Sequence, residues 1–350
     1  MGCLFSMVST VDRFNGFYRF YRFKGVLILC EQRVFLKLKI LRRFSIFMRR
    51  TTPAIPIEPA EPAEPLVESV QTTNIPEGGV MSMVGRKGTI ITVFSTAYAV
   101  GKTLIAINMA AELAKSRHTV CLIDLDLQFG DVASALKLMP EKTIADAERS
   151  MREHPDDTVA AEYLTPFSSG GVSFDVMANP KLLEEAYNLD TTLIRDLVVQ
   201  LQLEYDYLII DTTSTFSALN LSLMDLSTVI DFIGIVDFIP TIKNMKRGSD
   251  ALKELGYDDN KIRYVLNRSN ARTRINVKDV EAILGHQFHY VIPNDFQTAA
   301  ESIKTGVPLV LSAKDTPLAK GIRTMVDTYE EDSASPQKSQ EGGWLSRLFS

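Results

Sequence analysis

The segment TIITVFSTAYAVGKTLIAINMAAELAK, residues 89–115, decides the fold. It opens with β-branched and aromatic residues, 89–94, which are typical of a strand buried in a parallel sheet. Residues 103–115 carry apolar side chains at the spacing of an amphipathic helix. The loop between them ends in Gly101 and Lys102, and this order of strand, loop and helix predicts a phosphate-binding loop.

Short apolar runs alternate with helical patterns along the rest of the chain. Further strands are predicted at residues 119–123, 172–177, 207–210, 229–236, 262–266 and 289–292, and further helices at 192–203, 243–255 and 318–329. Such alternation is typical of βαβ units, whose crossover helices cover both faces of a sheet. The sequence therefore predicts an α/β fold, a three-layer parallel sheet with helices on both faces.

Composition shifts divide the chain into five segments. Residues 1–51 form a basic and aromatic-rich N-terminal extension. The stretch before Met48 is interpreted as the product of a mis-annotated translation start, and a basic membrane-surface segment is the alternative. Residues 52–85 form a Pro- and Glu-rich linker. We expect the P-loop domain at 86–330, a polar linker at 331–342 and an amphipathic tail at 343–350.

The charge and the cysteine content of the sequence argue against several classes of protein. Residues 1–50 hold eleven Lys and Arg against two acids, so of 38 cations and 43 anions the remaining 300 residues hold 27 against 41. An acidic body disfavours general nucleic-acid binding. Three scattered cysteines exclude a disulfide framework and indicate the cytoplasm. No apolar run approaches the roughly 20 residues that a membrane span needs.

The residues at the end of the loop suit a phosphate group. In such loops, backbone N–H groups and the N-terminus of the following helix hold phosphates. Lys102 is then expected to reach the β- and γ-phosphate oxygens, and the Thr103 hydroxyl to hold Mg²⁺. The predicted cofactors are ATP and Mg²⁺. A collapsed loop that binds no nucleotide is the alternative.

With Asn108-Met109-Ala110-Ala111 after it, the loop resembles the deviant Walker A region of MinD/ParA proteins, usually K-G-G-V-G-K-T-[TS]. The resemblance implies nucleotide contacts from Val100, Gly101, Lys102, Thr103 and Leu104. Ala97 stands where the family has a signature lysine that reaches across a nucleotide-sandwiched homodimer, and Tyr98 and Ala99 stand where it has glycines. These departures predict weak or absent ATP hydrolysis.

Aspartates follow two of the predicted strands. Residues 124–131, DLDLQFGD, resemble the family's D-x-D segment, which makes Asp126 the candidate catalytic residue, orienting water, and a candidate metal ligand. Asp211 resembles the Walker B aspartate and is the other candidate metal ligand besides Thr103. A solvated acidic turn is the alternative for the first segment.

Two later strand ends resemble the segments with which the family holds adenine. They supply Asn267 and Arg268, and then Pro293, Asn294 and Asp295. An Asn amide can both donate to and accept from a base edge. The alternative is that these are ordinary residues of strand-end loops.

Within the family, residues 124–131 and 306–309 (GVPL) are most similar to the CpaE/TadZ branch, which helps to localise Flp pilus assembly. The resemblance implies a localisation protein with pilus-assembly partners. The alternatives are a division-site ATPase of the MinD kind with division partners, a ParA partition protein, a pseudo-ATPase scaffold and related P-loop enzymes. Iron-protein reductases need cluster cysteines that this chain lacks.

The last residues predict an attachment to the inner face of the cell membrane. Trp344, Leu345, Leu348 and Phe349 would share one face of a helix, with Arg347 as its single cation. This tail resembles the membrane-targeting helix of MinD. A frayed end, or a tail packed on the body, is the alternative.

Overall fold

The computed structural model describes residues 18–23, 26–31, 87–269 and 275–334. The predicted linker at 52–85 and the predicted tail at 343–350 lie outside the described residues. The chain divides into two units, up to Gly79 and from Val80. In the first unit, β1 (Tyr18–Phe23) and β2 (Val26–Glu31) pair as an antiparallel hairpin.

The second unit is built on one sheet with the strand order β10-β9-β8-β3-β7-β4-β6-β5. The strands are β3 (Thr89–Phe94), β4 (Val120–Leu125), β5 (Thr165–Ser169), β6 (Val172–Met177), β7 (Tyr207–Thr212), β8 (Val229–Gly234), β9 (Ile262–Leu266) and β10 (Tyr290–Val291). All neighbouring pairs except β5 and β6 are parallel. The predicted fold class is confirmed, with a sheet that is mostly parallel.

The edge strand β5 is an addition to the predicted strands. It runs antiparallel to β6 and joins it through Gly170 and Gly171, whose φ angles are 58° and 79°. A two-residue turn with positive φ at both positions matches the twist of a hairpin. Pro166 within β5 is tolerated because an edge strand leaves one row of N–H positions unpaired.

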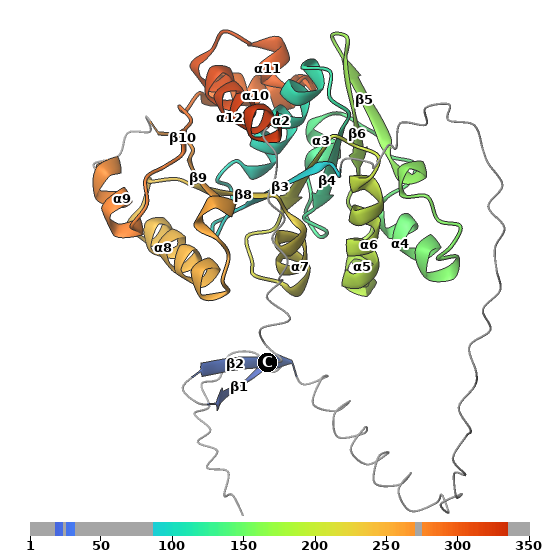
Figure 1. Ribbon diagram of the computed structural model, residues 1–350, viewed down its shortest axis with the longest axis horizontal. Helices are drawn as coiled ribbons and strands as arrows, with labels where there is room; N and C mark the ends of the chain where they lie inside the picture. The colour runs from blue at the N-terminus through green and yellow to red at the C-terminus, as the bar shows by residue number, and fades with distance from the viewer. Residues whose placement is uncertain (1–17, 24–25, 32–86, 270–274, 335–350) are drawn as a thin grey trace, which may run out of the picture. The chain divides into compact units, whose positions relative to one another are not determined.

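Helices cover both faces of the sheet (Figure 1). One face carries α2 (Lys102–Lys115), α10 (Phe296–Thr305), α11 (Leu309–Ser312) and α12 (Pro317–Ala334). The other carries α4 (Ile144–Glu153), α5 (Leu183–Asn188), α6 (Thr191–Gln202), α7 (Ala218–Leu226), α8 (Ile239–Glu254) and α9 (Val277–Leu284). Short elements are α3 (Val132–Ala135), η1 (Ala160–Tyr163) and η2 (Asp259–Lys261).

Neighbouring residues of the central strands belong to different cores. Ile91 of β3 packs in the cluster that contains the buried residues of α2 and α12, whereas Ile90 packs with those of α4 and α6. Successive side chains of a strand point to opposite faces, so a strand covered on both sides is apolar throughout. Because these strands are parallel, their carboxyl ends lie along one edge of the sheet, where the candidate site lies.

The last of the described helices, α12, connects parts of the second unit that are far apart in sequence. Arg323 Nε of α12 donates to Glu112 Oε1 of α2 at 3.0 Å, and the Tyr329 hydroxyl donates to the Asp231 carboxylate of β8. Ile322, the residue before Arg323, is fully buried. α12 therefore closes the core on the α2 face of the sheet.

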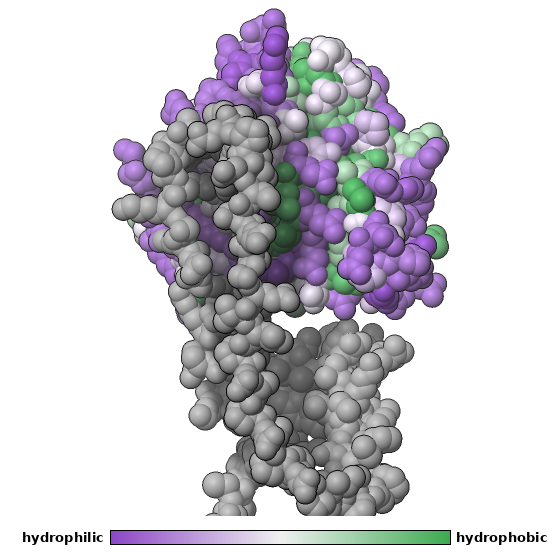
Figure 2. All heavy atoms as spheres, turned by 45° about the vertical axis from the view of Figure 1, so that its right-hand side comes forward, coloured by the Kyte–Doolittle hydropathy of each residue, from purple (hydrophilic) through white to green (hydrophobic). Residues whose placement is uncertain are grey.

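The surface seen from the β5 side is largely hydrophilic, with separate hydrophobic patches between the polar residues (Figure 2). None of the described helices is long and apolar enough to cross a lipid bilayer.

Candidate functional site

The candidate site lies at the carboxyl ends of β3, β4, β7 and β9. The loop 95–101 leaves β3, and α2 begins at Lys102 directly after it. Gly101, with φ 97°, is the residue before the helix. A Cβ at this position would lie 2.6 Å from Asn267 Nδ2, so both the backbone angle and the close approach require glycine.

Lys102 is held inside the site by a chain of hydrogen bonds. Its Nζ donates to Ser214 Oγ at 2.9 Å, and Ser214 Oγ donates to the Ala97 carbonyl at 2.8 Å. The side chain is 9% exposed. Burial lowers the Lys102 pKa, while Asp211 and Asp126 act to raise it. A phosphate entering the site would compete with Ser214 for this ammonium group.

Sequence reasoning did not select Ser214. The signal was the run of hydroxyl residues 212–215 after β7, but the sequence alone does not show that the third of them meets Lys102.

Thr103 and Asp211 meet as their positions at neighbouring strand ends predict. Thr103 Oγ1 donates to Asp211 Oδ2 at 2.6 Å. Asp211 Oδ1 is buried and has no hydrogen-bond partner among the described residues. Burial raises the Asp211 pKa, although the Thr103 hydrogen bond and the charge of Lys102 act to lower it.

These oxygens fit Mg²⁺. The ion prefers hard oxygen ligands and is usually held by one or two carboxylates together with substrate phosphates. No group of three or more His, Cys, Asp or Glu side chains in the described part of the chain is arranged to hold a metal alone. The orphaned Asp211 oxygen beside the Thr103 hydroxyl is suited to a partial site that phosphate oxygens complete.

The two carboxylates of the D-x-D segment, Asp124 and Asp126, differ in burial and in hydrogen bonding. Asp124 is fully buried and accepts hydrogen bonds from the N–H groups of Asp126 at 3.2 Å and Val132 at 3.1 Å. A Cβ at Gly130 would lie 2.3 Å from Asp124 Oδ2, so the loop folds around this carboxylate. Burial, followed by the charge of Asp211, raises the Asp124 pKa. Asp126 is only half-buried and accepts from the Phe129 N–H at 3.3 Å, which leaves it as the more accessible acid.

The two residues after β9 hold the phosphate loop from outside. Asn267 Nδ2 donates to the Val100 carbonyl at 2.8 Å, and Arg268 Nη2 donates to the Ala99 carbonyl at 3.0 Å. Ala99 has φ 56° and Arg268 has φ 55°, in the left-handed region that disfavours side chains. Ala99 thus adopts the backbone conformation that a glycine would adopt freely.

These contacts orient the loop. In a planar trans peptide the C=O points opposite to the N–H that follows it. Fixing the carbonyls of Ala97, Ala99 and Val100 against neighbouring side chains therefore directs the following N–H groups away from those side chains. We refer to Ser214, Asn267 and Arg268 as the loop clamp.

The remaining predicted site residues lie in the phosphate loop, at the start of α2 and after β10. The Val100 side chain is fully buried and Leu104 packs partly buried against the core, so only their main chains can face a nucleotide. The Asp295 carboxylate accepts from Thr298 N at 3.0 Å and caps α10. Pro293 lies against α12, where a Cβ at Gly321 would be 3.4 Å from Pro293 Cδ. Asn294 lies between Pro293 and Asp295 in the chain. The Ser269 N–H donates to the Ile292 carbonyl at 3.0 Å, and this hydrogen bond joins the two predicted adenine segments.

Comparison with known proteins gives consistent matches. The model of the "CobQ/CobB/MinD/ParA nucleotide binding domain" matches residues 91–309. An uncharacterized ATP-binding protein of Methanocaldococcus jannaschii is 29% identical over 239 residues, covering 63% of this chain and 80% of the relative.

Solved structures share the fold. A ParA family ATPase from Chlorobium tepidum has a TM-score of 0.62 and 20% identity, covering 68% of this chain and 98% of that one. The septum site-determining protein MinD of Pyrococcus horikoshii, complexed with Mg-ADP, has a TM-score of 0.60 and 18% identity, covering 70% and 97%.

Proposed function

Because the chain belongs to the CobQ/CobB/MinD/ParA nucleotide-binding domain family, we propose that it binds Mg-ATP at the phosphate loop and hydrolyses it slowly. The observation that carries the proposal is the convergence of Lys102, Thr103 and Asp211 at the start of α2. The MinD relative complexed with Mg-ADP supports the choice of ligand.

Each residue has a proposed part. Lys102 and the loop N–H groups, with the helix N-terminus, bind the phosphates. Thr103 and Asp211 hold Mg²⁺, which when bound neutralises phosphate charge. Asp126 orients the attacking water. The adenine is held between the segments that follow β9 and β10, which supply Asn267, Arg268, Pro293, Asn294 and Asp295. An Asn amide has two N–H donors, so Asn267 can hold the loop and still face a base.

Slow turnover follows from the residues of the loop. Ala97 offers no cation to the transferring phosphate, whereas family members with a lysine there do. Removing one preorganised charge of this kind typically lowers a rate by about 10²- to 10³-fold. A homodimer, if formed around nucleotide, lacks that bridging lysine.

The test is ATP titration by isothermal calorimetry with Mg²⁺ present. Wild type is expected to bind, and Lys102→Ala is expected to lose binding. Lys115→Ala is the matched control, since Lys115 sits in the last turn of the same helix and pairs with Glu112. Equal binding by wild type and Lys102→Ala, or no binding by either, would identify a pseudo-ATPase scaffold.

For the cellular role we propose a localisation protein of the CpaE/TadZ kind, which supports Flp pilus assembly. The segments 124–131 and 306–309 motivate the choice of branch. Deleting the gene should then abolish Flp pili while division stays normal. Minicells or filaments in the deletion strain would favour the MinD-like alternative, and plasmid or chromosome loss would favour the ParA alternative.

We also propose that the protein binds the inner face of the cell membrane through residues 343–350, which lie outside the described part of the chain. Liposome co-sedimentation of the full chain should exceed that of a version ending at Gly343, most clearly at high protein concentration, where self-association adds avidity. Equal sedimentation of the two would remove the tail from this role.

A further inference from the structure

Asn220 lies in the first turn of α7 and is buried, with 1% of its surface exposed. Before it, the five residues 213–217 connect the end of β7 to the start of α7. Four of the five are Ser or Thr and none is Pro, so their own side chains restrict the backbone little. We refer to residues 213–217 as the β7–α7 loop. Contacts with other parts of the chain have to give this loop its shape.

The Asn220 side chain binds the β7–α7 loop at two places. Its Nδ2 donates to Thr213 Oγ1 at 2.9 Å and to the Thr215 carbonyl at 2.7 Å, with a longer contact of 3.4 Å to the Thr213 carbonyl. A side-chain amide has two N–H groups, and the two shorter hydrogen bonds use both of them. The Asn220 main-chain N–H donates to Ser217 Oγ at 3.2 Å, which fixes the start of the helix. Asn220 thus holds the residues on both sides of Ser214.

Ser214 is the loop residue that reaches the nucleotide site. Its Oγ accepts a hydrogen bond from Lys102 Nζ and donates one to the Ala97 carbonyl. Because the hydroxyl proton is used for Ala97, the lone pairs of the oxygen face the ammonium group. The position of this hydroxyl therefore determines where the Lys102 ammonium group lies.

Other contacts hold the two ends of the loop. Thr212 Oγ1, just before the loop, donates to the Val93 carbonyl of β3 at 2.8 Å. Near the other end, the Phe216 ring packs on the Phe94 ring with 4.9 Å between centroids. Between these two anchors, Asn220 joins the loop to α7.

We infer that Asn220 is a positioning residue for the phosphate site. By holding Thr213 and Thr215 it places Ser214 Oγ, and through Ser214 it keeps the Lys102 ammonium group in a resting contact. An incoming phosphate has to displace that contact. This last step rests on the proposed binding of ATP, whereas the position of Lys102 in the free protein does not.

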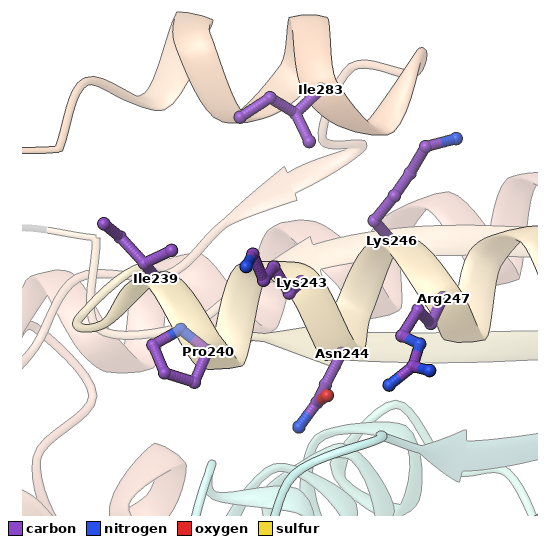
Figure 3. Close-up of a pocket in the computed structure, with 7 residues that line it drawn as sticks. All are labelled: Ile239, Pro240, Lys243, Asn244, Lys246, Arg247 and Ile283. Atoms are coloured by element: carbon purple, nitrogen blue, oxygen red, sulfur yellow. The ribbon is translucent and has the colours of Figure 1, made fainter.

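The contacts of Asn220 are separate from the groove of about 650 Å³ that lies between α8 and α9 (Figure 3). The residues that line the groove, among them Ile239, Lys243 and Ile283, all belong to those two helices. Variants of Asn220 therefore leave the lining of the groove intact.

The test measures the reaction of Lys102 with acetic anhydride in the full chain without nucleotide. Competitive acetylation at a series of pH values, read by mass spectrometry, gives the pKa and the accessibility of each lysine. Asn220→Ala should raise the rate constant of deprotonated Lys102 about threefold or more, because its hydrogen-bond acceptor is no longer held in place. Lys115, on the same helix, is the internal reference. Ser222→Ala is the control variant, since this buried hydroxyl donates to the Leu219 carbonyl within α7, and Lys102 should react as in wild type.

Ser214→Ala distinguishes a positioning role of Asn220 from a purely structural one. Alone, it should raise the Lys102 rate constant at least as much as Asn220→Ala does. Adding Asn220→Ala to Ser214→Ala should then change the rate constant less than about twofold, because the effect of Asn220 passes through Ser214. Two effects that multiply, or a wild-type rate constant in Asn220→Ala, would overturn the inference.

Thr213→Val is a milder variant that decides the question if Asn220→Ala does not fold. It keeps the shape of a half-buried side chain and removes the acceptor of one Asn220 hydrogen bond. The Lys102 rate constant should rise by a smaller factor than in Ser214→Ala, and this rise should disappear in the Ser214→Ala background. A wild-type rate constant in Thr213→Val would count against the role of Asn220.

Calorimetric titration with Mg-ATP tests the displacement step. In Ser214→Ala the phosphate no longer competes for the ammonium group, so the Kd should fall about threefold or more below that of wild type. Weaker binding by this variant would mean that Ser214 supports the bound nucleotide, and it would overturn the displacement step. Absence of ATP binding by wild type and variant alike would contradict the proposed function, while the acetylation results would still decide the role of Asn220.

Discussion

At the residue scale, the phosphate loop depends on side chains that come from distant strands. Three residues that follow two other strands, Ser214 after β7 and Asn267 and Arg268 after β9, bind its carbonyls. In most phosphate loops glycines give this conformation freely, whereas here Ala99 is held in a left-handed conformation that is strained by about 1–2 kcal/mol. The clamp therefore offsets the missing glycines.

Replacing Asn267 with Ala should test the clamp. The Val100 carbonyl would lose a hydrogen bond in a buried setting, so the free energy of unfolding should fall by about 1–3 kcal/mol. Amide hydrogen exchange in residues 97–101 should accelerate, and ATP should bind more weakly. Asn260→Ala, at the exposed η2 turn, is the control. Unchanged exchange in the loop would show that Asn267 does not hold it.

Asp231 gives a pH dependence of stability. Burial raises the pKa of Asp231 to about 7 from an ordinary value of 3.8, against the effects of the Tyr329 hydroxyl and Arg263. The native state therefore keeps a proton that the unfolded chain has lost, so this residue makes stability fall as pH rises from about 4 to about 7.

Asp231→Asn should remove that contribution. Relative to wild type, the variant should gain up to about 3 kcal/mol of unfolding free energy between pH 5 and pH 8, because about two units of the pKa shift lie in this window and each pKa unit corresponds to about 1.4 kcal/mol. Urea unfolding at both pH values measures this difference. Parallel stability curves for the two proteins would contradict the assignment.

At the element scale, the loop 95–101 keeps its shape but lacks the family's cation. Ala97→Lys with Tyr98→Gly and Ala99→Gly should raise ATP turnover by about one to two orders of magnitude, because it restores a positive charge near the phosphates and relieves the strain at Ala99. Ala97→Met in the same background supplies the length without the charge and should not. Equal rates of phosphate release for the Lys and Met versions would mean that the missing lysine does not limit turnover.

Elements buried on both faces could be predicted, and elements at the edges could not. The ranges predicted for β3, β6 and β9 coincide with the observed strands, because their apolar runs reflect cover on both sides. β5 was missed because Pro166 argues against a strand, and only an edge position makes it acceptable. α7 was missed because its apolar residues nearly alternate, and α9 because it is short.

The candidate site was predictable to a similar extent. Lys102, Thr103 and Asp211 stand next to recognisable strands, and the parallel topology brings them together. The hydrogen bond from Lys102 to Ser214 depends on two neighbouring strands, β3 and β7, that are far apart in sequence. The hydrogen bond from Arg268 to the Ala99 carbonyl depends in addition on a left-handed φ that Arg rarely adopts. No local pattern encodes either contact.

At the scale of the whole molecule, α12 joins the end of the second unit to α2, the first helix of that unit. Ile322→Ala should lower the free energy of unfolding by about 2–5 kcal/mol, because it opens a cavity where α12 contacts the main core. Thr324→Ala, on the exposed side of the same helix, should change it by less than about 0.5 kcal/mol. Thermal or urea unfolding measures both, and similar losses from the two variants would mean that α12 does not complete this core.

The contact between Glu112 and Arg323 also determines when a newly synthesised chain can complete its core. Its two partners are 211 residues apart, so α2 leaves the ribosome well before α12 exists. At ordinary rates of synthesis that interval is on the order of 10–40 s. During that interval the part of α2 that contacts α12 lacks its native cover, and exposed apolar surface of this kind promotes aggregation. α12, the last of the described helices, thus fixes the earliest moment at which this core of a nascent chain can be completed.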